Sequence, residues 1–183
     1  MLEIRPLSEL SESDLRRIIT GYTAHEKYRV TYTATDQATT FSLELVSLAT
    51  PYTQHFNPGE DEIQMIQQKL QAGWSLGAFD GLELAAIAIA SPEKWNDTLR
   101  IWEFHVAESQ RGKGIGRQLM DRLAQRAAPA GLRAMVVETQ STNVPAIRFY
   151  RKAGFMVEGI DISYYTNQDY PDGEMAVFMK RRL

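Results

Sequence analysis

The spacing of hydrophobic and polar positions predicts strands and helices in turn along the first half of the chain. Strand patterns repeat every two residues and amphipathic helices about every 3.6, so the two are separable. The predicted elements are an edge strand over 2–5, a helix from Ser11 to before Gly21, an extended threonine-rich stretch over 28–48, a short helix through 63–70, and strands 74–79 and 82–90 around an Asp80-Gly81 hairpin turn. Pro92, Asn96 and Asp97 predict a loop over 91–98.

The second half predicts a strand, a glycine-rich turn, a helix and another strand. The fourth strand covers 100–106, and the helix after the turn has an apolar face formed by Ile115, Leu119, Leu123 and Ala127. A continuously apolar run over 134–137 is typical of a strand buried on both faces. This order predicts a βαβ unit with a ligand at the carboxyl edge of its strands. A helix over 143–153 and two closing strands, 156–165 and 174–181, complete an α/β protein.

Composition limits the function. The length of 183 residues, without an internal repeat or linker, predicts a single domain over residues 1–183. A net charge of −3 argues against nucleic-acid binding, and the absence of cysteine excludes disulfides, a thiolate nucleophile and a cysteine-ligated metal. No signal-peptide pattern is present, and the longest apolar run, 84–90, is too short to span a membrane. We therefore expect a cytoplasmic protein without a membrane or nucleic-acid partner.

Residues 110–117, Gln-Arg-Gly-Lys-Gly-Ile-Gly-Arg, have the composition of a phosphate-binding loop. Its glycines allow the backbone to turn tightly, and the following helix would point its first N–H groups at an anion. Three basic side chains surround that position: Arg111, Lys113 and Arg117. Alone, the segment is equally compatible with a nucleotide, a sulfate or a plain turn before a helix.

Two polar residues, Glu103 and His105, alternate on one face of the fourth strand, with Trp102, Phe104 and Val106 on the other. Polar groups in a buried strand require an explanation. His105 is suited to be a base by its ordinary pKa, but a hydrogen-bonded core histidine is the favoured interpretation.

Taken together, two motifs resemble the GNAT superfamily of acyl-CoA-dependent N-acetyltransferases. The phosphate-loop motif Arg-x-x-Gly-x-Gly occurs as residues 111–116. The signature Asn-x-x-Ala-x-x-Phe-Tyr-x-x-x-Gly-Phe occurs at Asn143, Ala146, Phe149, Tyr150, Gly154 and Phe155. The resemblance implies a mixed, mostly antiparallel twisted sheet flanked by helices, with an acetyl-CoA-binding core at about 100–155 and no metal.

The resemblance also implies roles for individual residues. The acetyl-CoA pyrophosphate would bind Arg111, Gly112, Lys113, Gly114, Ile115, Gly116 and Arg117. The pantetheine arm would run along the backbone of Phe104, His105 and Val106 and near Asn143 and Ala146. Tyr150 would contact the cofactor and protonate the departing sulfur, and Glu103 would hold the cationic substrate or pass on its proton. Asn143 as a helix N-cap and Tyr150 as a core aromatic remain open alternatives.

Within the superfamily the sequence is most similar to streptothricin acetyltransferases, through Glu138-Thr139-Gln140 ahead of Asn143, and Phe41–Leu45 ahead of Pro51-Tyr52. The implied acceptor is the β-lysine amine of such antibiotics, whose acetylation confers resistance. Carboxylates would then line the acceptor side, and the candidates are Glu103, Glu138, Asp161 and Glu44. The alternatives are a polyamine, another amino-drug or a protein amino group as acceptor, or a non-catalytic acyl-CoA-binding module. A homodimer is usual in families of this kind.

Overall fold

The computed structural model describes residues 2–183, and the chain divides into two compact units that alternate along the sequence. The first contains residues up to 20, 56–137 and 181–183, and the second contains 21–55 and 138–180. The predicted single domain starts at Met1, which lies outside the described residues, and it stays a prediction.

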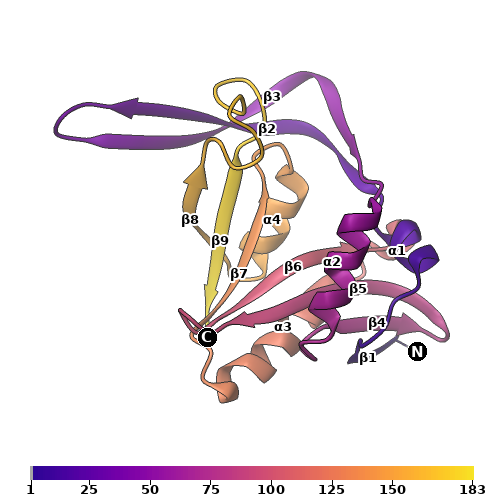
Figure 1. The fold of residues 1–183 in the computed structure, drawn as a ribbon. Helices are drawn as coiled ribbons and strands as arrows, with labels where there is room; N and C mark the ends of the chain where they lie inside the picture. The colour runs from indigo at the N-terminus through magenta and orange to yellow at the C-terminus, as the bar shows by residue number, and fades with distance from the viewer. Residues whose placement is uncertain (1) are drawn as a thin grey trace. The chain divides into compact units, whose positions relative to one another are not determined.

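The first unit is built on a mostly antiparallel sheet with strand order β1-β4-β5-β6-β7 (Figure 1). Its strands are β1 (Leu2–Pro6), β4 (Leu76–Asp80), β5 (Glu83–Glu93), β6 (Thr98–Val106) and the first part of β7 (Ala134–Gln140). Its helices are α1 (Glu12–Ile18), α2 (Glu60–Leu70), α3 (Ile115–Ala127) and the 3₁₀ turns η1 (Glu108–Gln110) and η2 (Ala128–Ala130). Only the β6–β7 pair is parallel within this unit's described strands, which confirms the predicted βαβ arrangement of β6, α3 and β7.

Helices cover both faces of β5, which explains its unbroken run of buried residues. Ile87 and Ile89 belong to one core cluster with side chains of α1 and α2, while the small residues Ala86, Ala88 and Ala90 alternate with them along the strand. Helix α3 packs against β4, β5 and β6 and buries the predicted face, from Ile115 to Ala127. A strand enclosed on both faces has no solvent side and so shows no polar alternation.

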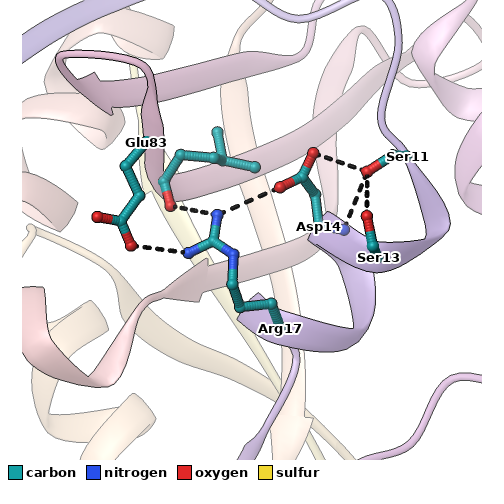
Figure 2. A network of polar contacts seen from close by, with 6 residues as sticks. Ser11, Ser13, Asp14, Arg17 and Glu83 are labelled. Atoms are coloured by element: carbon teal, nitrogen blue, oxygen red, sulfur yellow. Dashed lines mark hydrogen bonds and ion pairs between the residues drawn. The ribbon is translucent and has the colours of Figure 1, made fainter.

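Local capping chemistry places α1 where the sequence predicts it. Ser11 Oγ accepts the Asp14 N–H at 3.0 Å and donates to the Asp14 carboxylate at 2.7 Å (Figure 2). Arg17, in the last turn, donates to Asp14, to Glu83 at 3.2 Å and to the Leu84 carbonyl at 3.1 Å. The helix is therefore tied to the first residues of β5.

The predicted loop over 91–98 is wrong at its start, because β5 continues through Pro92 to Glu93. The pairing of β5 with β4 ends at Leu76↔Ala88, whereas its pairing with β6 reaches Glu93↔Thr98. Proline is tolerated where a strand is paired on one side, because its missing N–H is not needed for a second ladder.

The second unit contains a long two-stranded hairpin, β2 (Gly21–Ala34) with β3 (Thr39–His55), and a sheet with the order β7-β9-β8. Strands β8 (Met156–Asp161) and β9 (Ala176–Arg182) are antiparallel, and helix α4 (Val144–Lys152) packs against β2. The extended stretch predicted over 28–48 is thus the middle of a longer hairpin. The strand predicted over 156–165 ends at Asp161, whose carboxylate accepts the Ser163 N–H at 2.9 Å and starts a turn.

Candidate active site

The loop between β6 and α3 has the backbone of an anion cradle. Gly112 and Gly114 have φ of +77° and +79°, and a Cβ added at either position would meet no atom within 4 Å. Gly114 is the N-cap residue and supplies no side-chain cap, and the first helical hydrogen bond runs from Gln118 N to the Gly114 carbonyl at 3.2 Å. The amides of residues 115–117 precede that bond, so the helix begins with N–H groups suited to an anionic ligand.

The three basic side chains of the loop differ in what holds them. Arg111 Nε donates to the Val106 carbonyl at 3.1 Å, which fixes the loop to the end of β6. Lys113 Nζ donates to Gln110 at 3.0 Å, and Arg117 pairs with Asp121 at 2.8 Å. All three side chains are exposed. They can therefore add positive potential at the cradle without a desolvation penalty.

Gly116 and Ile115, also predicted to bind the cofactor, are buried in the first turn of α3. The Ile115 side chain is buried and Gly116 has none, so both residues would meet a ligand through their backbone. Asp121, one turn later, also binds Arg181 at 2.8 Å. Burial raises the pKa of the Asp121 carboxyl, but hydrogen bonds from the two arginines outweigh it and lower the pKa overall.

Strand β6 contains a β-bulge ahead of the cradle. Its register against β5 shifts between Ile89↔Glu103 and Ala90↔Ile101, which leaves Trp102 as the extra residue. Within the first unit the ladder of β6 to β7 ends at Arg100↔Val136, whereas its ladder to β5 continues to Val106. The segment of Phe104, His105 and Val106 thus lies beyond the parallel pairing and leads directly into the glycine loop.

The structure brings Glu103 and His105 together, as their alternation predicts. His105 Nε2 lies 2.9 Å from Glu103 Oε2, both side chains are mostly buried, and Phe56 packs edge-on against the imidazole. A third titratable group, Glu62 in the first turn of α2, was missed by the sequence interpretation because an acidic first turn is ordinary helix chemistry. Burial and then the Glu103 charge raise the pKa of Glu62. Glu62 therefore lies near enough to Glu103 for the Glu103 charge to raise its pKa.

Helix α4 carries the second motif in the second unit. Asn143 is its N-cap, and its Oδ1 accepts the Ala146 N–H at 3.1 Å, so the structural role of Asn143 is confirmed. Tyr150 is 6% exposed, and its ring packs against Phe149 and Phe155 with centroids 5.4 and 5.6 Å away. The tyrosine ring thus belongs to the core of this unit, and a role for its hydroxyl stays a prediction.

The other predicted substrate carboxylates are separately engaged. Glu138 accepts a hydrogen bond from the Tyr165 hydroxyl, and burial followed by the Glu138 charge raises the pKa of Tyr165. Glu44 pairs with Arg29 at 2.7 Å on the exposed face of the hairpin, and Asp161 organises the turn after β8. Glu44 and Asp161 therefore each have a partner within the same hairpin or turn, whereas Tyr165 lies 27 residues from Glu138 along the chain.

Glu174 was not predicted as a site residue, although its carboxylate accepts hydrogen bonds from three hydroxyl groups. Tyr22, Tyr52 and Thr142 all donate to its Oε1. Burial, followed by the hydrogen bond to Glu174 and its charge, raises the pKa of Tyr52 to about 12. Burial raises the pKa of Tyr22 by a larger amount. The partners lie more than 30 residues from Glu174 along the chain, so no local pattern identifies them.

Over residues 2–183 no group of three or more His, Cys, Asp or Glu side chains is arranged to hold a metal. None of the helices in the same range has the length and apolarity needed to cross a membrane.

A family model and two sequence relatives identify the family to which this chain is similar. The model of the Acetyltransferase (GNAT) family matches residues 42–155. A streptothricin acetyltransferase of Streptomyces lavendulae is 37% identical over 121 residues, which cover 66% of this chain and 62% of that protein. One from Escherichia coli is 34% identical over 102 residues, covering 56% and 58%. The chain thus spans about three-fifths of the length of these relatives.

Solved structures extend the similarity to nearly the whole chain. A nourseothricin acetyltransferase crystal structure has a TM-score of 0.78 and 28% identity, covering 99% of this chain and 98% of that one. A Bacillus anthracis protein solved with acetyl coenzyme A has a TM-score of 0.72 at 20% identity over the full length of both chains, which supports the fold. The expected mixed, mostly antiparallel sheet flanked by helices is confirmed, and the chain belongs to the Acetyltransferase (GNAT) family.

Proposed function

We propose that this protein is an N-acetyltransferase that transfers the acetyl group of acetyl-CoA directly to a primary amine. The observation that supports it best is the cradle after β6, where two left-handed glycines leave open space before the first amides of α3. When bound, acetyl-CoA supplies the thioester whose acyl group is transferred. The residues of the chain position that thioester and handle the protons.

The cofactor roles follow from the same segment. Arg111–Arg117 would bind the pyrophosphate through the glycine backbone and the exposed basic side chains. Phe104–Val106, beyond the parallel ladder, would run beside the pantetheine in the manner of β-strand addition. The Asn143 side chain and the Ala146 amide already form the α4 cap. The backbone of both residues would contact the same cofactor.

Two side chains are proposed for proton transfer. The amine must lose a proton before it attacks, and Glu103, buried beside His105 at 2.9 Å, is suited to accept it directly or through water. Tyr150 would donate a proton or a hydrogen bond to the departing thiolate, because a phenol remains protonated at neutral pH. Glu103 therefore acts on the acceptor and Tyr150 on the leaving group.

The acceptor that we propose is a streptothricin-type antibiotic, acetylated on its β-lysine amine. The relatives above are named streptothricin and nourseothricin acetyltransferases, and the alignment with the latter covers nearly all of both chains. Glu103 and Glu138 provide carboxylates of the kind that a cationic acceptor requires.

A thiol-release assay with acetyl-CoA tests the proposal. Streptothricin, spermidine, an aminoglycoside and a peptide with a free amino terminus would be compared by kcat/KM, and the highest value is expected for streptothricin. A markedly higher value for spermidine would replace the proposed substrate while keeping the chemistry. Tight CoA binding without turnover of any amine would instead show a non-catalytic acyl-CoA-binding module.

A further inference from the structure

The carboxylate of Glu174 sits in a hydroxyl-rich and aromatic setting within the second unit. Tyr52 donates to its Oε1 at 3.0 Å and Tyr22 at 3.3 Å, and Thr142 donates to the same oxygen. Tyr22 is 9% exposed and Thr142 is 7% exposed, so these donors are firmly held. Because these three hydrogen bonds converge on Oε1, that oxygen anchors the side chain and leaves Oε2 to accept from a ligand.

In the described part of the chain, Glu174 has no cation beside it, in contrast to three other glutamates of the same unit. Glu26 pairs with Arg148, Glu44 with Arg29, and Glu158 with Lys180. Across residues 2–183, no lysine or arginine forms an ion pair with Glu174, and its hydrogen-bond donors are neutral hydroxyls. A partly desolvated carboxylate held by neutral donors attracts a cation more strongly than one in water.

Aromatic rings stand beside this carboxylate. The rings of Tyr22 and Tyr52 lie 6.2 Å apart at 52°, and both direct their hydroxyls to Glu174. A third tyrosine, Tyr165, is near enough for the Glu174 charge to contribute to raising its pKa. A carboxylate with tyrosines beside it can recognise an ammonium group through a charge-assisted hydrogen bond, to which a nearby ring can add cation–π attraction.

We propose that Glu174, with Tyr22 and Tyr52, binds a second ammonium group of the acceptor, one that is not acetylated. The inference rests on the proposed acetyl transfer. The attacking nitrogen must be neutral, and Glu103 is the carboxylate proposed to take its proton. Glu174, whose Oε1 already accepts three hydroxyl hydrogen bonds, would instead stabilise the protonated form of an amine. A nitrogen held by Glu174 is therefore a recognition group. The acceptors belong to the class of compounds with at least two amino groups, and Glu174 is a specificity-determining residue.

The test compares matched diamines and monoamines. Putrescine and n-butylamine have the same carbon chain, and they differ in the second ammonium group. We expect wild-type kcat/KM to favour putrescine by about 10- to 100-fold, the range for a hydrogen bond to a charged group. Glu174→Gln keeps an Oε1 acceptor for the three hydroxyls but removes the charge. It should raise KM for putrescine by a similar factor and leave kcat, the n-butylamine kinetics and KM for acetyl-CoA unchanged.

Two further variants separate recognition from structure. Glu158→Gln, in which a carboxylate already paired with Lys180 is neutralised, should keep the wild-type preference for putrescine. Tyr52→Phe keeps the ring and removes one donor, and should weaken the preference less than Glu174→Gln. An equal loss for both amines in Glu174→Gln, or a wild-type enzyme that does not distinguish them, would overturn the inference while leaving acetyl transfer intact.

If the wild-type protein acetylates neither amine, the proposed function fails for these acceptors, and binding decides the inference separately. Calorimetric titration of putrescine should then show binding to the wild-type protein that is weakened in Glu174→Gln. Equal binding to both proteins would overturn the inference.

Discussion

Replacing Gly114 with alanine tests the cradle at its most demanding backbone position. Gly114 has φ +79° and ψ 0°, and a Cβ there would meet no atom within 4 Å. The substitution therefore adds no steric clash. Its effect is confined to the left-handed backbone conformation, which alanine adopts with difficulty.

The magnitude follows from that conformation. A non-glycine residue in the left-handed region costs about 1–2 kcal/mol. If the free loop relaxes to avoid this strain, binding must restore the conformation, and affinity for acetyl-CoA falls by about 5- to 30-fold, at tenfold for each 1.4 kcal/mol. If the loop instead keeps its shape, the strain appears as lost stability, partly offset by about 0.4–1 kcal/mol from the less flexible unfolded chain.

Gly131→Ala is a closely matched control. Gly131, after η2, has φ 81° and ψ 9°, and it too has no atom within 4 Å of an added Cβ. Both variants should be measured by urea unfolding, by calorimetric binding of CoA and by KM for acetyl-CoA. Gly131→Ala should change stability alone, whereas Gly114→Ala should also weaken CoA binding and raise KM.

The sum of the two effects is the decisive quantity. In Gly114→Ala, the loss of stability and the loss of CoA affinity should together approach the strain energy. If Gly114→Ala kept wild-type stability and wild-type affinity for CoA, or if the two losses together fell well short of that energy, the reasoning would be refuted. A full loss of stability with unchanged KM would instead show a loop that keeps its shape.

Three further predictions concern single side chains. Tyr150→Phe keeps the ring packing and should lower kcat by about 100-fold, the low end for acid–base catalysis, with an unchanged melting temperature; full activity would exclude the acid role. Glu62 has a raised pKa in the folded state, so its ionisation opposes folding at neutral pH. Glu62→Gln should therefore raise the unfolding free energy at pH 7, and the gain should vanish as pH falls below about 4.3, the pKa of an unfolded glutamate; denaturation at both pH values measures it, and a gain that persists in acid would contradict the assignment. Ser11→Ala removes the α1 cap and should destabilise the protein by about 1 kcal/mol in urea unfolding, whereas an unchanged midpoint would show that the cap contributes nothing.

Sequence reasoning succeeded where the determinants are local. Helix α3 was predicted because its apolar positions recur every four residues and the glycine turn and Pro129 mark its ends. The Asp80-Gly81 turn likewise fixes the β4–β5 hairpin. The β2–β3 hairpin was only partly foreseen, because mostly exposed strands lack the buried alternation that defines strand ends.

The parts of the candidate site that are formed by residues close together in the sequence could be predicted. Glu103 and His105 were placed on one face of the strand because they lie two residues apart, and the structure shows their side chains 2.9 Å apart. The bulge at Trp102 and the approach of Glu62 depend on the packing of separate elements and leave no local pattern. Glu174 was not predicted for the same reason, since its partners come from β2, β3 and the turn after β7.

The three residues 181–183 belong to the first unit although the preceding stretch, 138–180, belongs to the second. Arg181 binds Asp121 of α3, and the Leu183 N–H donates to the Arg133 carbonyl at 3.0 Å. During synthesis on the ribosome, a nascent chain that has emerged through Val137 therefore contains every helix segment of the first unit but lacks Arg181 and Leu183. The contacts of these two residues with Asp121 and Arg133 can form only after the second unit has been translated.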